Sequence, residues 1–180
     1  MVFIPWRMSY HRGMTSESII LIGVEVGLLK GLESMKWAIE SLQRFVEISA
    51  VSTVVQCRAF NDKTCLRAVI KATTPQTAEQ VIQELISIEY EYDEKLRVIE
   101  SLRCFLLTYE QQVNLSPGMI LPHPQMLDHT SWLYCAWEIF RNYRHPVLEQ
   151  TLDKLIAKTN MADIIFFGQG KSIISKPSAS

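Results

Sequence analysis

The 180-residue sequence has almost no net charge and no long apolar run, and each shortage excludes a class of protein. Because the formal net charge is −1, electrostatics gives no reason to expect binding to nucleic acid or to an anionic membrane. The apolar run Ile19–Val24 is far shorter than the roughly 18 residues that span a bilayer, and it is typical of a buried strand. We therefore expect neither a nucleic-acid partner nor a membrane partner.

Cysteine is also scarce, and its spacing is uninformative. The sequence contains no C-x-x-C pair, and most of the cysteines stand in apolar segments, where a free thiol behaves as a small hydrophobic side chain. This usage predicts reduced, buried thiols rather than a disulfide framework, and it favours a cytoplasmic protein. The cysteines are Cys57, Cys65, Cys104 and Cys135.

Hydrophobic residues make up 48% of the chain and charged residues 21%, which is typical of one soluble domain with a single core. Residues 1–17 lack the continuous apolar stretch of a signal peptide and are interpreted as an N-terminal extension. The domain is expected to span residues 18–160. Residues 161–180, whose end is rich in Gly, Ser and Lys, are expected to form a flexible C-terminal tail.

Hydrophobic periodicity predicts an α+β fold. The predicted elements alternate as strand, helix, strand, strand, helix, strand, which is the ferredoxin-like β-α-β-β-α-β order with an antiparallel sheet. Two more helices are expected to follow this core. The strands are predicted near residues 18–26, 48–60, 66–73 and 102–109, and the helices near 35–46, from Thr74-Pro75 to the acidic run 89–95, at 132–143 and at 147–159.

The segment after the last core strand contains two histidines, His123 and His129, and the first stands between Pro122 and Pro124. One interpretation is a stiff loop whose imidazole bonds to the backbone, and another is contact with an anion. A metal site formed by both histidines is not predicted, because no third ligand has suitable spacing. His145 is expected at the surface.

Several pieces of the chain resemble the 6-hydroxymethyl-7,8-dihydropterin pyrophosphokinase family of folate biosynthesis. That family has a strand ending in Leu-Leu-Tyr, then a hairpin, a Leu-Pro-His-Pro loop and a helix ending near Glu-Ile. The corresponding pieces here are 106–109, 121–124 and Glu138-Ile139, and Ile22-Gly23 with Gly27 resembles the family's glycine-containing opening. The resemblance spans residues 18–155 and implies the same ferredoxin-like fold.

The resemblance also implies an activity, the transfer of the β,γ-diphosphate of ATP to the pterin hydroxymethyl group. Such a transfer needs Mg²⁺ and cationic side chains to neutralise the phosphates, and Mg²⁺ needs carboxylate oxygens. The family supplies them as Asp-x-Asp on the last core strand. Here the two positions are Arg103 and Phe105, and neither side chain can bind Mg²⁺.

Other family positions are replaced as well. The family's substrate-binding Asn corresponds to Arg67, its arginine after the Leu-Pro-His-Pro loop to His129, and the aromatic that stacks on the pterin to Ser131. Its arginine-rich catalytic loop is shorter and acidic here. Two positions match: His123 corresponds to a histidine that contacts nucleotide phosphate, and Glu89 to a glutamate on the nucleotide side.

The sequence therefore predicts a divergent pyrophosphokinase homologue that is catalytically impaired, a pseudoenzyme with a pterin or a nucleotide as its ligand. Two alternatives remain open. The acidic run 89–94 could supply relocated Mg²⁺ ligands, with ATP and Mg²⁺ as the cofactors of an active enzyme. The chain could instead be a protein-interaction module, which exposed apolar area around Trp6, Trp132 or Trp137 would favour.

Overall fold

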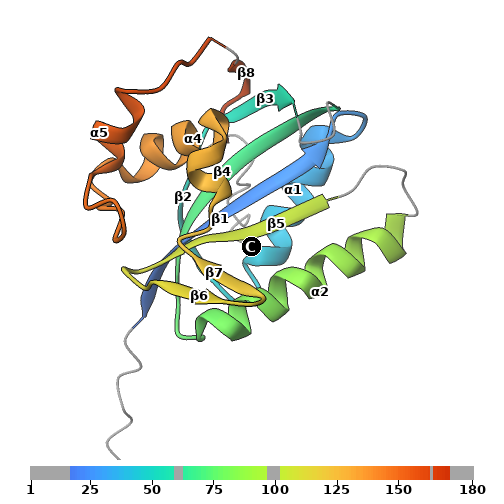
Figure 1. Cartoon of the computed structure of the whole chain (residues 1–180). Helices are drawn as coiled ribbons and strands as arrows, with labels where there is room; N and C mark the ends of the chain where they lie inside the picture. Colours follow the sequence, from blue (N-terminus) through green and yellow to red (C-terminus); the bar gives the residue numbers. More distant parts are fainter. Residues whose placement is uncertain (1–16, 59–62, 97–101, 163, 171–180) are drawn as a thin grey trace, which may run out of the picture.

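We analysed a computed structural model of the chain, which describes residues 17–58, 63–96, 102–162 and 164–170. The core elements follow the predicted order. Figure 1 shows that the strands form one main sheet and that the helices pack beside it. They are β1 (Ser18–Gly27), α1 (Gly31–Leu42), β2 (Glu47–Val51), β3 (Val54–Arg58), β4 (Thr64–Thr74), α2 (Ala78–Leu96) and β5 (Leu102–Tyr109). A hairpin and further elements follow: β6 (Asn114–Ser116), β7 (Met119–Leu121), α3 (Gln125–Asp128), α4 (Thr130–Phe140), α5 (Leu152–Ile156) and β8 (Ile165–Gly168).

The main sheet has the strand order β5-β1-β4-β3-β8, and β2 also pairs with β4. Each recorded pairing within it is antiparallel. Strands β1 and β4 are therefore central, and the split β2–β3 segment lies beside them. This is the ferredoxin-like arrangement, and the predicted α+β fold class is confirmed.

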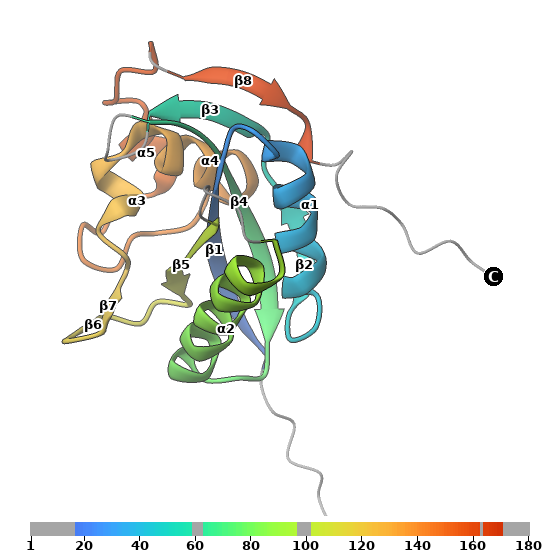
Figure 2. The same ribbon diagram turned by 90° about the vertical axis from the view of Figure 1, so that its right-hand side faces the viewer.

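Side chains from the central strands are buried on both faces of the sheet, because successive residues of a strand point to opposite sides. Ile20, Ile22 and Val24 of β1 belong to a core with residues of α1 and α2. Leu21 belongs instead to a second core with residues of α3, α4 and α5. Figure 2 shows the two groups of helices on either side of the sheet. We call the side of α3, α4 and α5 the α4 face. Among the described residues, no helix is long and apolar enough to cross a membrane.

The predicted second strand is interrupted. Ser52 and Thr53 separate β2 from β3, and Glu138 of α4 holds the break in place. One oxygen of this carboxylate accepts a hydrogen bond from the Thr53 amide at 2.6 Å, and the other accepts from the Thr53 hydroxyl at 2.8 Å. Glu138, which belongs to the Glu-Ile pair of the family resemblance, therefore ties α4 to the sheet.

Helix α2 begins later than the Thr74-Pro75 signal predicted. The Thr74 hydroxyl donates to the Phe45 carbonyl instead of capping the helix. The cap is Thr77, whose hydroxyl accepts from the Gln80 amide at 3.4 Å, while the Gln80 side chain accepts from the Thr77 amide at 2.9 Å. This reciprocal pair is a capping box.

The acidic composition of residues 89–92 is typical of an exposed helix face, but this expectation is wrong for Tyr92. That side chain is buried, its hydroxyl is 2.6 Å from the Ser34 hydroxyl, and its ring packs edge-on against Trp37. Tyr92 continues the apolar stripe of α2 into the acidic run, so the helix extends to Leu96.

The C-terminal part also differs from the prediction. A helix was expected at 147–159, but α5 covers Leu152–Ile156 alone, and residues 147–151 are not part of it. His145 is buried, at 5% exposure, rather than at the surface. Within the predicted flexible tail, β8 (Ile165–Gly168) pairs with β3 and extends the sheet. The predicted N-terminal extension, apart from Glu17, and residues 171–180 lie outside the described residues.

Candidate functional site

The Leu-Pro-His-Pro loop connects β7 to α3 and is fixed by its backbone. The Leu121–Pro122 peptide bond is cis, and the His123 amide donates to the Leu107 carbonyl of β5 at 2.8 Å. The imidazole Nδ1 of His123 accepts from the Gln125 amide at 3.3 Å. Burial lowers the pKa of His123 below its ordinary value. The ring is therefore a neutral acceptor held by its own loop at neutral pH.

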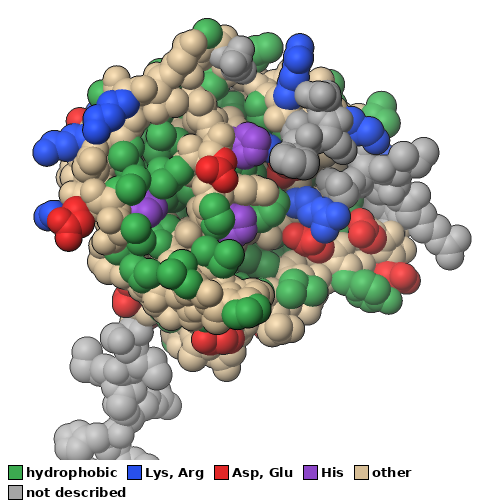
Figure 3. Space-filling view, in the orientation of Figure 1, with side chains coloured by type: hydrophobic (Ala, Val, Ile, Leu, Met, Phe, Trp, Pro, Cys, Tyr) green, Lys and Arg blue, Asp and Glu red, His purple; other side chains and the backbone are tan. Residues whose placement is uncertain are grey.

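His123 lines a small cavity of about 260 Å³, which we call the hairpin pocket. Its walls come from α2, from β5 and from the β6–β7 hairpin, and they are mostly apolar. The hairpin turns at Pro117-Gly118, where Gly118 has a φ of 88° that suits glycine. On this side of the molecule histidine side chains lie among hydrophobic ones, and most Lys and Arg side chains lie toward the margins (Figure 3). The lining residues include Ile82, Ile86, Phe105, Ile120 and His123.

The side chains of Arg103 and Phe105 project from β5 on the α4 face. Both contact other side chains of the protein. The Arg103 guanidinium pairs with a Glu89 carboxylate oxygen at 3.2 Å. The other oxygen of Glu89 accepts from the Cys104 amide at 2.7 Å. Burial raises the pKa of Glu89 above its ordinary value. Both Glu89 oxygens therefore have partners within the protein.

Phe105 is part of an aromatic cluster over the centre of the sheet. Its ring centroid is 5.4 Å from that of His123 and 5.7 Å from that of Trp132. Trp132 is fully buried and lies against Gly23 of β1, where a Cβ atom would be 2.8 Å from the indole Cζ3. The absence of a side chain at Gly23 thus allows the indole to pack directly on the sheet.

Arg67 is the centre of a buried polar network on the same face. Its side chain is 3% exposed, and its Nη2 is 2.6 Å from a Glu25 oxygen. Its Nε also donates to Glu25, and its Nη1 donates to the Ser131 hydroxyl at 2.8 Å. The guanidinium lies 4.8 Å from the ring centre of Trp132. Every donating nitrogen of this buried cation therefore has a partner, as burial of a charge requires.

Beside this network is a larger cavity of about 680 Å³, which we call the Arg67 pocket. It is formed by the ends of β3 and β4, the α3–α4 junction and the segment before β8. His129 lines it, and burial together with the nearby Arg67 charge lowers the pKa of His129. The other lining residues include Cys57, Arg58, Thr64, Arg67, Thr130 and Ser131.

The two loop histidines line different pockets, His123 the hairpin pocket and His129 the Arg67 pocket. Across the part of the chain that the structure describes, no group of three or more His, Cys, Asp or Glu side chains is placed to hold a metal ion. Trp132 is buried, and the Trp137 indole N–H donates to Asp153 at 2.9 Å. Trp6 lies outside the described residues.

Comparisons with known proteins point to one family. A 121-residue stretch is 28% identical to the 2-amino-4-hydroxy-6-hydroxymethyldihydropteridine pyrophosphokinase of Aquifex aeolicus, and it covers 64% of this chain and 76% of that protein. Among solved structures, HPPK-DHPS of Plasmodium falciparum superposes on 79% of this chain. The TM-score is 0.67 for its A437G form and 0.63 for the wild type with pterin and p-hydroxybenzoate, both at 9% identity. No model of a known protein family matches the chain.

The chain is a homologue of the pterin pyrophosphokinase of Aquifex aeolicus, and the resemblance to that family is supported. The Plasmodium structures share its fold, and the chain spans 45% of the A437G chain's length and 43% of the wild-type chain's. In this pyrophosphokinase homologue, the positions that the family resemblance marks as replaced are brought together by the fold. Arg67 donates both to Ser131 and to Glu25, and His129 lies in the pocket beside them.

Sequence reasoning treated these replacements one at a time and missed their connection. The antiparallel register pairs Glu25 with Arg67 on β4 and with Arg103 on β5. An acidic residue between two basic ones on neighbouring strands is a signal that strand pairing alone could have revealed. The contact of Cys57 with Cys65 was also missed, because their spacing in the sequence resembles no known motif.

Proposed function

We propose that this pyrophosphokinase homologue is strongly impaired in diphosphoryl transfer and retains a ligand-binding role at the nucleotide side of the fold. The observation that carries the proposal is the engagement of Arg103 with Glu89 and of Phe105 with His123 and Trp132. These are the two positions at which the family resemblance implies the metal-binding aspartates.

The chemistry explains why this arrangement opposes transfer. In transferring the diphosphate of ATP, the family is expected to use Mg²⁺ to neutralise charge that develops on the phosphate oxygens. Mg²⁺ requires oxygen ligands at near-octahedral positions. Arg103 is a cation and Phe105 offers no oxygen, so the residues present at these positions do not fit the metal. We therefore derive no catalytic step through it.

The acidic run gives the relocated-ligand alternative little support. Glu89 has both oxygens bound by protein groups. Glu91 pairs with Arg44 at 2.9 Å and with Lys95 at 3.4 Å, away from the residues that line the hairpin pocket. In this chain we infer that Glu89 has a structural role, because it ties the end of α2 to β5.

The hairpin pocket is the part of the site most suited to a retained ligand. Its apolar walls from α2 and β5 suit a flat heteroaromatic base, and His123 offers a polar group at one side. We infer that His123 contacts a nucleotide there, as the family resemblance implies. The family's pterin side corresponds to the Arg67 pocket, where Arg67 and Ser131 replace the residues expected to hold and stack on the pterin.

The decisive experiment measures AMP release from MgATP with 6-hydroxymethyl-7,8-dihydropterin, with the protein in excess so that one turnover is detected. The Aquifex aeolicus enzyme serves as the active control. Since the loss of one transition-state contact typically costs about 10² to 10³ in rate, we expect a rate at least about 10³-fold below the control. Pterin-dependent AMP release within about 10²-fold of the control would overturn the proposal.

A second experiment tests the ligand. Equilibrium dialysis with labelled ATP is expected to show binding whose affinity does not increase when Mg²⁺ is added, because the metal-binding carboxylates are replaced. His123→Ala should weaken this binding, and Ser87→Ala on the exposed side of α2 is the matched control. Affinity that rises steeply with Mg²⁺ would show that other oxygens hold the metal.

A further inference from the structure

Cys57 and Cys65 lie opposite each other on neighbouring strands. The antiparallel register pairs Cys57 of β3 directly with Cys65 of β4. Their Sγ atoms are 3.4 Å apart, and both thiols are free. Directly paired residues in an antiparallel sheet have Cα atoms about 4.5 to 5.5 Å apart, which is within the range of disulfides. The sulfur atoms need to approach by little more than an ångström to form a bond.

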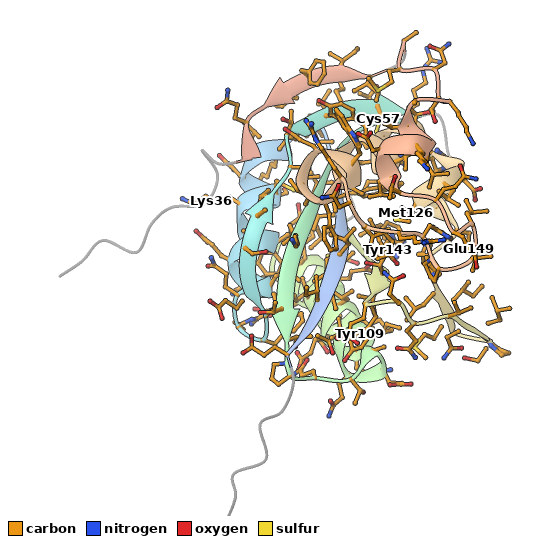
Figure 4. The ribbon with its side chains drawn as sticks, turned by 90° about the vertical axis from the view of Figure 1, so that its left-hand side faces the viewer. Lys36, Cys57, Tyr109, Met126, Tyr143 and Glu149 are labelled. Atoms are coloured by element: carbon orange, nitrogen blue, oxygen red, sulfur yellow. The ribbon has the colours of Figure 1, made fainter. Side chains whose placement is uncertain are left out.

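The two thiols differ in access. Cys57 is half-buried and lines the Arg67 pocket, whereas Cys65 is buried behind it at 4% exposure. Figure 4 shows Cys57 near β3 and β8, at that edge of the main sheet. The remaining cysteines, Cys104 and Cys135, are buried in the two cores at 8% and 0% exposure. A reagent that enters the pocket therefore meets Cys57 first.

The surroundings of Cys57 favour its thiolate. A hydrogen bond from the Cys65 thiol, aided by the positive charge of Arg67 and by Ser131, lowers the pKa of Cys57 to about 7, although burial and Glu25 act in the opposite direction. Donation of this hydrogen bond, together with burial, raises the pKa of Cys65. A thiol whose pKa lies near ambient pH is close to the optimum for attack on a disulfide.

We propose that Cys57 and Cys65 form a reversible dithiol–disulfide pair that is oxidised by small disulfides of the glutathione class. The Cys57 thiolate attacks one sulfur of the small disulfide and displaces one thiolate, which leaves a mixed disulfide on Cys57. Cys65 then gives up its proton and attacks the Cys57 sulfur, which displaces the second thiolate. The two protons from the protein thiols end on the two small thiols, so one disulfide is exchanged for another.

Because a second cysteine lies beside Cys57, the final product is a disulfide within the protein and not a stable mixed disulfide with the small thiol. Cys65 is already at 3.4 Å from the sulfur that it attacks, so the second step needs no rearrangement of the strands. The resulting bond joins the ends of β3 and β4 beside Arg67 and removes the nucleophilic thiolate from the pocket wall. This inference concerns thiols alone and does not depend on the proposed function.

The test incubates the folded protein in glutathione buffers of graded reduction potential and then blocks free thiols. The intact mass of the protein should fall by two hydrogens and should show no glutathione adduct. Peptide mapping should identify a Cys57–Cys65 bridge that a dithiol reductant reverses. Cys65→Ser should instead retain a glutathione adduct on Cys57. Cys57→Ser should leave Cys65 unmodified, because the attacking thiolate is absent.

Cys104→Ser and Cys135→Ser are the matched controls, and we expect both to form the bridge as the unaltered chain does. The midpoint of the pH dependence of Cys57 alkylation is also expected to lie at higher pH in Cys65→Ala than in the unaltered chain, since the hydrogen bond from Cys65 that lowers the Cys57 pKa is lost. A stable glutathione adduct on Cys57 of the unaltered protein, or a bridge involving Cys104 or Cys135, would overturn the proposal.

Discussion

Glu25 of β1 and Arg67 of β4 are directly opposite each other in the sheet and share an ion pair of 2.6 Å that is almost closed to solvent. By the family resemblance, Arg67 replaces a substrate-binding asparagine and Glu25 replaces the asparagine of the family's glycine-containing opening. The two replacements therefore compensate each other, because each supplies the charge that makes burial of the other tolerable.

We expect Arg67→Met to lower the free energy of unfolding by about 3 kcal/mol, because it leaves the Glu25 carboxylate partly buried without its partner. The ion pair of Arg103 with Glu89 offers a contrast, since the Arg103 side chain is 57% exposed. Arg103→Met is expected to cost at most about 1 kcal/mol. Urea unfolding of the two variants measures both values, and equal losses would contradict this reading of the network.

The close packing of Trp132 on Gly23 gives a second prediction. In Gly23→Ala the new methyl group would lie 2.8 Å from the indole Cζ3 of Trp132, and the indole is fully buried, so it has little room to shift. Such overpacking typically costs about 1 to 3 kcal/mol. Gly168→Ala, whose nearest neighbour atom is 4.0 Å away, is the control and should change stability little. Thermal unfolding of the two variants, together with indole fluorescence, tests the difference.

Stability should fall in mild acid, partly through His145. Burial lowers the pKa of this imidazole below its ordinary value, so the unfolded chain takes up the proton more readily than the folded one. The contribution of His145 is therefore fully present above about pH 6.5 and is lost as the pH falls through the folded pKa. His123 and His129 shift in the same direction.

The variant His145→Gln isolates the contribution of His145 to the pH dependence of stability. It removes the titrating imidazole, while the glutamine side-chain oxygen can still accept from the Leu148 amide. We expect the unaltered protein to lose more stability than His145→Gln between pH 7.5 and pH 5, as measured by urea unfolding at each pH. Parallel losses in the two proteins would mean that His145 does not titrate on unfolding.

The start of α2 gives a fourth prediction. Thr77→Ala removes the hydroxyl that accepts from the Gln80 amide, and the loss of such a cap costs about 1 kcal/mol. Gln80→Ala should cost less, since its side chain contributes the other half of the capping box. Circular dichroism during urea unfolding tests both variants. If Thr77→Ala has no effect, the helix is held by packing alone.

The fold was accessible from the sequence because the strands and helices of the core carry strong periodic patterns. Leu102–Tyr109 was predicted residue for residue, as alternating burial would allow. The errors occurred where contacts between residues far apart in the sequence determine the local structure. Tyr92 is buried by Ser34 and Trp37, and β8 is a strand because β3 offers it an edge. Neither partner is visible from the local sequence.

The site was only partly accessible for the same reason. The family resemblance identified which positions had changed, including Arg67 and Ser131. It could not reveal that these side chains bond to each other across 64 residues, because a hydrogen bond depends on register and side-chain direction. The pairing of Cys57 with Cys65 depends on the register of β3 against β4, which the sequence does not give.

The place of β8 in the sheet has a consequence for synthesis of the protein. Strand β3 is completed at Arg58, yet the strand that covers its outer edge is Ile165–Gly168. While the nascent chain leaves the ribosome, that edge keeps unpaired backbone donors and acceptors, a template for association with other chains. Release of the C-terminal segment therefore protects the domain, and ribosomes stalled before β8 would yield chains prone to aggregate.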